Sequence, residues 1–334
     1  MSAWDAQRER ALARADNTTW HEGMDMRNWY PLCISGEPAR IYWRHLGERR
    51  FTDSFFEQTL SRQPPGQRLT CQTPAAALDQ FDDGLRPGAL IFHISRCGST
   101  LLTQLLAALP QCVVMSEPPV IDALLRLHHA GPGRQDAPVL LRKLVLALGQ
   151  RRFAEEEKFF IKFDSWHIHN LPLIRLAFPA TPCIFLYREP EAVLASHRRQ
   201  RGPQMVPGML EPALLPPPQA IHAADLDGYA GAILRGFFAA ATVGARRGQF
   251  KLINYSQLPA VPDLLRWLGI ACSDSEQQAL LSRARFHSKA SGTPFRGDPA
   301  PAPSAGLGRD AAGIQALYLE LEQLRLAQAP LAGC

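Results

Sequence analysis

The feature that most constrains the fold of this chain is a series of short apolar runs separated by stretches with helical spacing. The runs are bounded by polar or turn residues, and their composition is typical of strands buried on both faces. The apolar runs are Ala89–Ile94, Cys112–Met115, Phe159–Phe163, Cys183–Tyr187 and Phe250–Asn254. Helical spacing occurs over Thr100–Leu109, Ile121–Leu127, Val139–Arg152 and Glu191–Arg199. This alternation predicts a three-layer α/β fold with a central parallel sheet of about five strands flanked by helices.

The composition narrows the classes of protein that this chain can belong to. A hydrophobic fraction of 46% is ordinary for a globular chain of 334 residues, and a net charge of +5 without long runs of like charge argues against a nucleic-acid partner. Seven cysteines without Cys-x-x-Cys pairs argue against a disulfide framework or a structural zinc site, and favour a reducing compartment. The chain has no apolar leader and no apolar stretch long enough to span a bilayer, so we expect a cytoplasmic protein without a membrane span.

The first 85 residues do not follow the strand and helix alternation. They contain one alternating run, Ala39–His45, which is typical of a strand with one buried face. We therefore predict an N-terminal extension or cap over residues 1–85, acting on the acceptor side or as an interaction element, and a main domain over residues 86–334. Two proline-rich stretches, Gly202–Gln219 and Gly297–Gly308, are predicted to be loops.

A polar loop follows the first buried strand and leads into an apolar helix. Gly98 lets the backbone approach a ligand closely, Ser99 and Thr100 supply hydroxyl groups, and Arg96 adds positive charge. The N–H groups of the first helical turn would point at an anion bound there. This pattern predicts a phosphate cradle; the alternative is that Ser99 or Thr100 only caps the helix.

The loop differs from two better-known phosphate sites. A Walker A motif requires Gly-Lys-Ser/Thr at its end, and Ser99 stands where the lysine belongs. Cys97 is not followed by an arginine that could hold a phosphate over its thiol, so we interpret it as a small residue that fits the loop.

The segment Ser95–Leu102 resembles the 5′-phosphosulfate-binding loop of the sulfotransferases that use 3′-phosphoadenosine 5′-phosphosulfate (PAPS), in the form where arginine replaces the lysine of cytosolic members. The resemblance implies a P-loop NTPase-like version of the α/β fold and PAPS as the sulfuryl donor. It implies that the 5′-phosphosulfate is held by Arg96, Cys97, Gly98, Ser99, Thr100 and Leu101.

The segment Ile184–Ser196 resembles the 3′-phosphate segment of the same family, which implies that Arg188 and Ser196 bind the 3′-phosphate. The residues agree independently, because Arg188 leaves the carboxyl end of a predicted strand, where open α/β sheets bind ligands. A guanidinium fork also suits a phosphate dianion. The alternative is a surface ion pair for Arg188 and a solvated helix face for Ser196.

Two later segments carry weaker resemblances. Lys251–Leu258 resembles the late strand of the family and implies that Tyr255 is an adenine neighbour, although Ser256 replaces the usual glutamate. Near the C-terminus, Lys289 and Arg296 lie where the family has a basic loop over the cofactor phosphates, but the consecutive Arg-Lys-Gly is absent.

Sulfuryl transfer needs a base for the acceptor proton and positive charge at the leaving oxygen. Glu117 follows the second strand at the sheet edge of the phosphate loop and is the first candidate for the base. Asp164, which takes the position of the family's catalytic histidine, is the second and His167 the third. The resemblance implies that Lys162 tunes the leaving group, and Arg96 is placed to stabilise it. Glu117 could instead be a plain loop residue, and Asp164 a helix cap.

These observations predict a sulfotransferase that acts on a hydroxyl or amine of an unidentified small-molecule acceptor. We expect no metal, because a sulfuryl group carries less charge than a terminal phosphoryl group. A nucleotide kinase with a degenerate P-loop and a non-catalytic nucleotide-binding module are the alternatives. The oligomeric state, including a possible homodimer, is left open.

Overall fold

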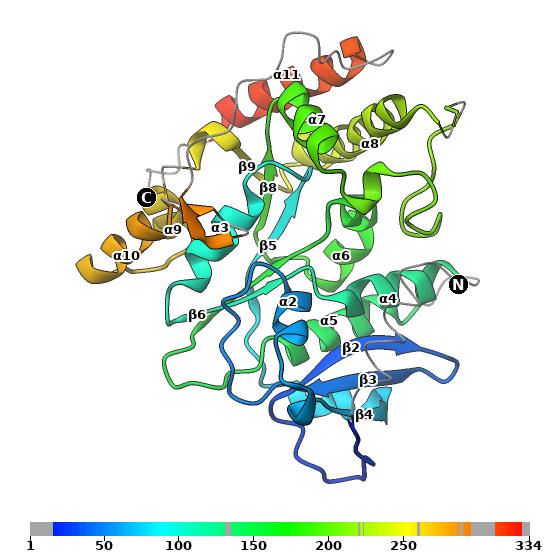
Figure 1. Cartoon of the computed structure of the whole chain (residues 1–334), viewed down its shortest axis with the longest axis vertical. Helices are drawn as coiled ribbons and strands as arrows, with labels where there is room; N and C mark the ends of the chain where they lie inside the picture. Colours follow the sequence, from blue (N-terminus) through cyan, green and yellow to red (C-terminus); the bar gives the residue numbers. More distant parts are fainter. Residues whose placement is uncertain are drawn as a thin grey trace. The chain divides into compact units, whose positions relative to one another are not determined.

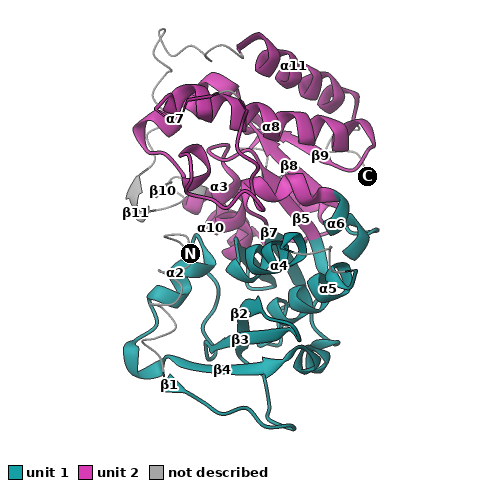
Figure 2. Cartoon of the chain, turned by 90° about the vertical axis from the view of Figure 1, so that its right-hand side faces the viewer, with its two compact units in different colours: residues 1–88, 109–162, 172–181 teal, residues 89–108, 163–171, 182–334 magenta. Residues whose placement is uncertain are grey.

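The computed structural model describes residues 16–130, 135–219, 221–222, 224–258, 261–284, 286–287, 290–294 and 311–328. Contacts divide the chain into two compact units (Figure 2). The first unit holds residues 1–88, 109–162 and 172–181, and the second holds residues 89–108, 163–171 and 182–334. Within the described residues, no helix combines the length and the apolar character that crossing a membrane requires.

The N-terminal part of the first unit forms a four-stranded sheet with the order β1-β4-β3-β2. Its strands are β1 (Asp16–Asn17), β2 (Trp29–Ser35), β3 (Arg40–His45) and β4 (Leu69–Pro74). The predicted alternating run is β3, which pairs antiparallel with both β2 and β4. Ile41 and Trp43 are fully buried on this strand while Arg40 is exposed, so one face of the strand contributes to the core.

The first unit also contains helices and turns, five of which lie in the described residues between 56 and 148. These five are α2 (Phe56–Ser61), η1 (Pro65–Gln67), η2 (Ala75–Phe81), α4 (Pro119–His129) and α5 (Ala137–Leu148). Helices α4 and α5 pack against β2, so the N-terminal sheet shares a core with helices from the middle of the chain. The Arg152 guanidinium carbon lies 4.3 Å from the centroid of the Phe51 ring in this core.

A five-stranded sheet with the order β6-β7-β5-β8-β9 is the second sheet of the chain (Figure 1). Its strands are β5 (Pro87–His93), β6 (Cys112–Ser116), β7 (Lys158–Lys162), β8 (Cys183–Tyr187) and β9 (Lys251–Asn254). The pairs β6 with β7, β5 with β8 and β8 with β9 are parallel. Each strand lies within two residues of its predicted run, and the predicted α/β class with a parallel sheet flanked by helices is confirmed.

The remaining elements follow the strands of the parallel sheet. They are α3 (Ser99–Ala107), η3 (Ser165–Asn170), α6 (Leu171–Ala177), α7 (Pro190–Arg199), η4 (Pro203–Met205), α8 (Leu226–Arg246), η5 (Tyr255–Gln257), α9 (Val261–Trp267), α10 (Asp274–Ala284), the β10 (Phe286–His287) and β11 (Ala290–Pro294) hairpin, and α11 (Ala311–Ala327). The helix α11 packs along α8 and contacts β9 and α7 (Figure 1). The predicted loop over residues 202–219 contains only the short turn η4 among its described residues, and residues 297–308 lie outside the described part of the chain.

Candidate functional site

The loop between β5 and α3 has an unusual backbone. Ser95 and Arg96 have φ angles of 71° and 51°, and Gly98 has a φ of 82°. The left-handed region is unfavourable for side chains such as serine and arginine, and it persists where the surrounding structure holds it, often at binding sites. The Ser95 N–H donates to His93 Nδ1 at 2.9 Å and so helps to hold this turn.

The start of α3 matches the predicted cradle in its local geometry. Gly98 is the N-cap, and Ser99 and Thr100 are the first two helical residues, so neither serves as the cap. A glycine N-cap has no side-chain oxygen for the N–H groups of the first turn, an arrangement that favours an anion at that position. The Cys97 side chain is fully buried, and its thiol donates to the Leu186 carbonyl oxygen at 3.3 Å, as expected for a residue that fits the loop rather than a nucleophile.

Arg96 ties the loop to the end of α7. Its guanidinium Nη2 donates to the Gln200 carbonyl oxygen at 2.6 Å. Burial, and after it the positive charge of Arg199, lowers the pKa of Arg96. The loop therefore keeps a cation in a partly desolvated position close to a second cation, which favours a bound anion.

Residues distant in sequence meet around Tyr255 in the second unit. The Arg188 guanidinium carbon, just after β8, lies 4.2 Å from the centroid of the Tyr255 ring. A Cβ at Gly98 would lie 2.8 Å from Cδ2 of the same ring and 2.1 Å from Leu258 Cδ1. The cradle glycine, the arginine and the tyrosine are therefore close neighbours, and only a residue without a side chain fits at position 98.

The other predicted donor-site residues are less closely joined to this cluster. Ser196 lies on α7 and is partly exposed. The Ser256 N–H and Oγ both donate to Asn254 Oδ1 at 3.0 Å, so the serine at the position of the family glutamate bonds to Asn254, the N-cap of η5. Lys289 and Arg296 lie outside the described residues.

An ion pair in the first unit joins two of the predicted catalytic residues. Lys162 ends β7 in register with Ser116 of β6, and Glu117 follows directly with a φ of 56°. The distance between Lys162 Nζ and Glu117 Oε1 is 2.8 Å, and the side chain of Lys162 is 0% exposed whereas that of Glu117 is 22% exposed. The Glu117 N–H also donates to the Lys162 carbonyl oxygen at 2.8 Å.

The N-terminal segment contributes to the surroundings of this pair. Lys162 Nζ lies 4.8 Å from the centroid of the Phe55 ring, a distance at which the ring face attracts a cation. Sequence reasoning missed Phe55, because nothing in its neighbourhood indicates a long-range contact with β7. The positive φ angles of Ser95, Arg96 and Glu117 could not be predicted from the sequence either, because these residue types rarely adopt such angles.

Asp164 and His167 occupy a different kind of position. Asp164 is the N-cap of η3, and the two residues form a capping box in which the Asp164 N–H donates to His167 Nδ1 at 3.2 Å. Both side chains are buried. Asp164 therefore acts as a helix cap in the structure, as the alternative interpretation predicted. The same capping box uses Nδ1 of His167 as a hydrogen-bond acceptor.

The structure of this chain is similar to solved structures, whereas its sequence has no match. No family model matches the chain, and no curated protein sequence matches it. The solved structure of the sulfotransferase STF1 from Mycobacterium tuberculosis H37Rv is similar with a TM-score of 0.39 and 17% identity, covering 62% of this chain and 74% of that one. The sulfotransferase domain of the Synechococcus PCC 7002 olefin synthase is similar with a TM-score of 0.39 and 15% identity, covering 74% and 97%. Both of these solved structures are named as sulfotransferases.

Proposed function

We propose that this chain is a sulfotransferase that uses PAPS as donor and a small-molecule hydroxyl or amine as acceptor. The observation that carries the proposal is that two predicted anion-binding elements meet at one aromatic ring. The glycine of the strained loop and the arginine after β8 both lie against Tyr255. A nucleotide with phosphate groups on both sides of its ribose needs two separate cationic sites and an apolar face for its base.

The residues present fit such a donor. Arg96 and the first-turn N–H groups of α3 would hold the 5′-phosphosulfate, Arg188 and Ser196 the 3′-phosphate, and Tyr255 the adenine. Cys97, Gly98, Ser99, Thr100 and Leu101 would complete the 5′ cradle, and Lys289 and Arg296 would close over the phosphates. When bound, the donor supplies the sulfuryl group, and the proposal includes no metal.

Glu117 is the proposed base. Its carboxylate would take the proton of the acceptor hydroxyl or amine, and the buried Lys162 ammonium 2.8 Å away would orient that carboxylate. Arg96 would stabilise the charge that develops on the leaving phosphate. Asp164 and His167 remain the second and third candidates, since their capping contacts already engage them.

The acceptor side is proposed to include the N-terminal extension over residues 1–85. The contact of Phe55 with Lys162 supports this, because it brings an aromatic side chain of that segment to the proposed acid–base pair. A cytoplasmic location is also proposed, since the six cysteines among the described residues are free thiols.

Isothermal titration calorimetry tests the donor. We expect the protein to bind adenosine 3′,5′-bisphosphate without metal and more tightly than ATP with magnesium. Binding of ATP with magnesium alone would contradict the proposal and favour a nucleotide kinase. Binding of the bisphosphate without transfer to any member of a broad acceptor panel would favour a non-catalytic nucleotide-binding module.

Amide substitutions test the base. We expect Glu117→Gln to abolish sulfuryl transfer while the affinity for the bisphosphate stays near that of the wild type, because the carboxamide keeps the shape of the side chain but is not a base. Asp164→Asn is the matched comparison and should retain transfer. Full activity of the Glu117 variant would disprove the assignment, and loss of transfer only in the Asp164 variant would move the base to that residue.

A further inference from the structure

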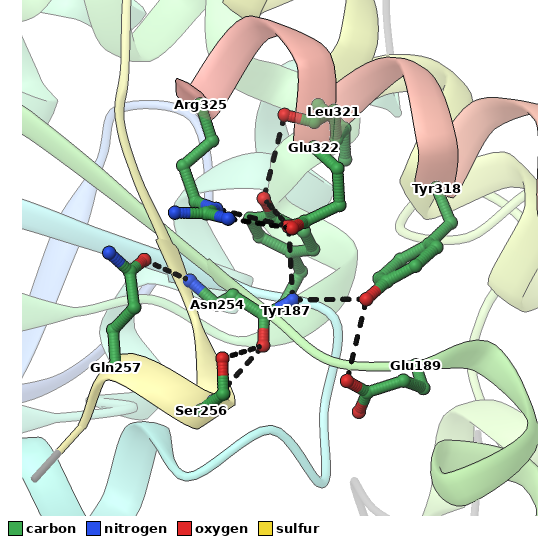
Figure 3. A network of polar contacts seen from close by, with 9 residues as sticks. All are labelled: Tyr187, Glu189, Asn254, Ser256, Gln257, Tyr318, Leu321, Glu322 and Arg325. Atoms are coloured by element: carbon green, nitrogen blue, oxygen red, sulfur yellow. Dashed lines mark hydrogen bonds and ion pairs between the residues drawn. The ribbon is translucent and has the colours of Figure 1, made fainter.

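A network of polar side chains joins the C-terminal helix α11 to the carboxyl ends of β8 and β9 (Figure 3). The Glu322 carboxylate is its centre and accepts hydrogen bonds from three other side chains. Tyr187 donates its hydroxyl, Asn254 donates Nδ2 at 3.0 Å and Arg325 donates Nη2 at 2.7 Å. All four side chains are partly or fully buried.

The members of this network are chain neighbours of the proposed donor-site residues. Tyr187 directly precedes Arg188, and Asn254 directly precedes Tyr255. One carboxylate on α11 therefore connects the two strand ends from which the stacked arginine and tyrosine emerge.

A second side chain of α11 reaches the other flank of the arginine segment (Figure 3). The Tyr318 hydroxyl accepts from Asn254 Nδ2 at 3.2 Å and donates to Glu189 Oε1 at 3.4 Å. Contacts from α11 thus reach the residue before Arg188 and the residue after it.

The protonation states of Glu322 and Tyr187 favour the hydrogen bond between them. Burial raises the pKa of the Glu322 carboxyl, but the hydrogen bonds from Arg325, Tyr187 and Asn254 outweigh it, so its pKa lies below the ordinary value. Burial, followed by the bond to Glu322, raises the pKa of Tyr187. The tyrosine is therefore a neutral donor and the glutamate a charged acceptor at neutral pH, which is the stronger form of hydrogen bond.

We propose that Glu322 is a positioning residue of the donor site, which holds the strand ends at Tyr187 and Asn254 so that Arg188 meets the 3′-phosphate while stacked on Tyr255. The inference rests on the proposed function. It assigns to α11 a part in nucleotide selection in addition to its packing on α8.

Other contacts of α11 attach the helix without touching these strand ends. Glu320 accepts from Arg246 of α8 at 2.5 and 2.9 Å, and the Arg246 side chain is 61% exposed. Gln328 accepts from the Leu252 N–H at 3.0 Å and donates to the Phe250 carbonyl oxygen at 2.7 Å, along the edge strand β9. Glu320→Gln is therefore a matched control for Glu322→Gln, with the same chemical change on the same helix.

The experiment compares two nucleotides. Adenosine 3′,5′-bisphosphate carries the 3′-phosphate that Arg188 is proposed to bind, and adenosine 5′-monophosphate lacks it. Calorimetry gives the ratio of the two affinities for the wild type, Glu322→Gln and Glu320→Gln. We expect Glu322→Gln to lower the affinity for the bisphosphate about tenfold, with little change for the monophosphate, because a glutamine cannot accept from three donors at once. Glu320→Gln should keep the wild-type ratio.

The outcomes separate the inference from its premise. If the wild type prefers the bisphosphate and Glu322→Gln keeps that preference, or loses affinity equally for both nucleotides, the inference is wrong and the proposed function survives. If the wild type does not distinguish the two nucleotides, the proposed function fails and the inference fails with it. An equal loss of preference in Glu320→Gln would also overturn the role of Glu322.

A second variant covers the case in which Glu322→Gln does not fold, as judged by its circular dichroism. Tyr187→Phe removes one hydrogen bond of the network and keeps the ring. It should reduce the preference for the bisphosphate about threefold. An unchanged preference in this variant would overturn the inference.

Discussion

Lys162 and Arg188 are two cations at the carboxyl ends of strands, and their surroundings differ. Lys162 at the end of β7 is 0% exposed and has the Glu117 carboxylate 2.8 Å away. Arg188 after β8 is 14% exposed and lies over the Tyr255 ring, and its ion pair with Glu189 is longer, 3.9 Å between Nε and Oε2, with Glu189 itself 49% exposed. The first cation has a carboxylate at close range, and the second has an aromatic face at 4.2 Å and a longer ion pair.

This difference fits the two chemical tasks proposed for these cations. A buried ammonium that forms an ion pair with a carboxylate can hold that carboxylate in one position, as a general base requires. The Arg188 guanidinium, stacked on the Tyr255 ring, is a planar group with several donors that matches the geometry of a phosphate. The carboxylate of Glu189 is more distant and more exposed, so its ion pair with Arg188 is weak. The comparison leads to the proposal that Lys162 serves the base and that Arg188 serves the donor.

The largest effect is expected at the buried pair. Glu117→Ala should lower the free energy of unfolding by about 3 kcal/mol, because it removes the nearest carboxylate from a fully buried ammonium. Lys162→Met should cost only about 1 kcal/mol, since the remaining carboxylate keeps access to water. Urea unfolding of both variants measures the asymmetry. A larger loss in Lys162→Met would mean that packing of the lysine stem, and not charge compensation, dominates at this position.

The second largest effect is expected for the guanidinium group of Arg188. Arg188→Lys keeps the charge but loses the fork and much of the stacking, so the affinity for adenosine 3′,5′-bisphosphate should fall about thirtyfold with little change for adenosine 5′-monophosphate. Arg266→Lys, on the exposed face of α9 where Arg266 pairs with Asp263, is the control. A lysine variant that binds as well as the wild type would show that Arg188 acts only as a point charge or not at all.

The ring beneath the arginine is expected to have a smaller effect. Tyr255→Leu removes the aromatic face and should weaken bisphosphate binding about fivefold, whereas Tyr255→Phe should stay close to the wild type. Calorimetry of the two variants gives the contribution of the ring. An equal loss in both would assign the effect to the hydroxyl group instead.

The smallest effect concerns acid stability in the network behind Arg188. The pKa of Glu322 lies below its ordinary value of 4.5 in the folded state, so its stabilising contribution is present above that pH and is lost as the pH falls through the lower folded value. Melting temperatures of the wild type and Glu322→Gln should therefore differ at pH 7 and converge in acid. A difference that persists in acid would mean that the charge of Glu322 is not the source of the stabilisation.

The parallel sheet was predictable because a strand buried on both faces must be apolar along its whole length. The apolar runs around Ile91, Val114, Phe160 and Phe185 meet this requirement and can be recognised in the sequence. The polar loop between β5 and α3 was predictable for a similar reason, since its glycine, its hydroxyls and its arginine are adjacent in the chain; its anion binding stays a prediction.

The contacts around the site were less predictable. The meeting of Gly98 with Tyr255, the contact of Phe55 with Lys162 and the carboxylate of Glu322 behind Tyr187 all join residues that are distant in sequence. No local pattern encodes such pairs, because they depend on which strands become neighbours and on where a helix docks.

By itself, the sequence determined the strands, the helices that separate them and the adjacent residues predicted to hold an anion, since all of these depend on local periodicity and local residue types. Tertiary structure decided which residues share a site. It brought the carboxylate of Glu117 to the ammonium of Lys162, the ring of Tyr255 to Arg188, and α11 to the strand ends. The physical reason is that desolvation, ion pairing and stacking act through space, over distances that only the folded chain sets.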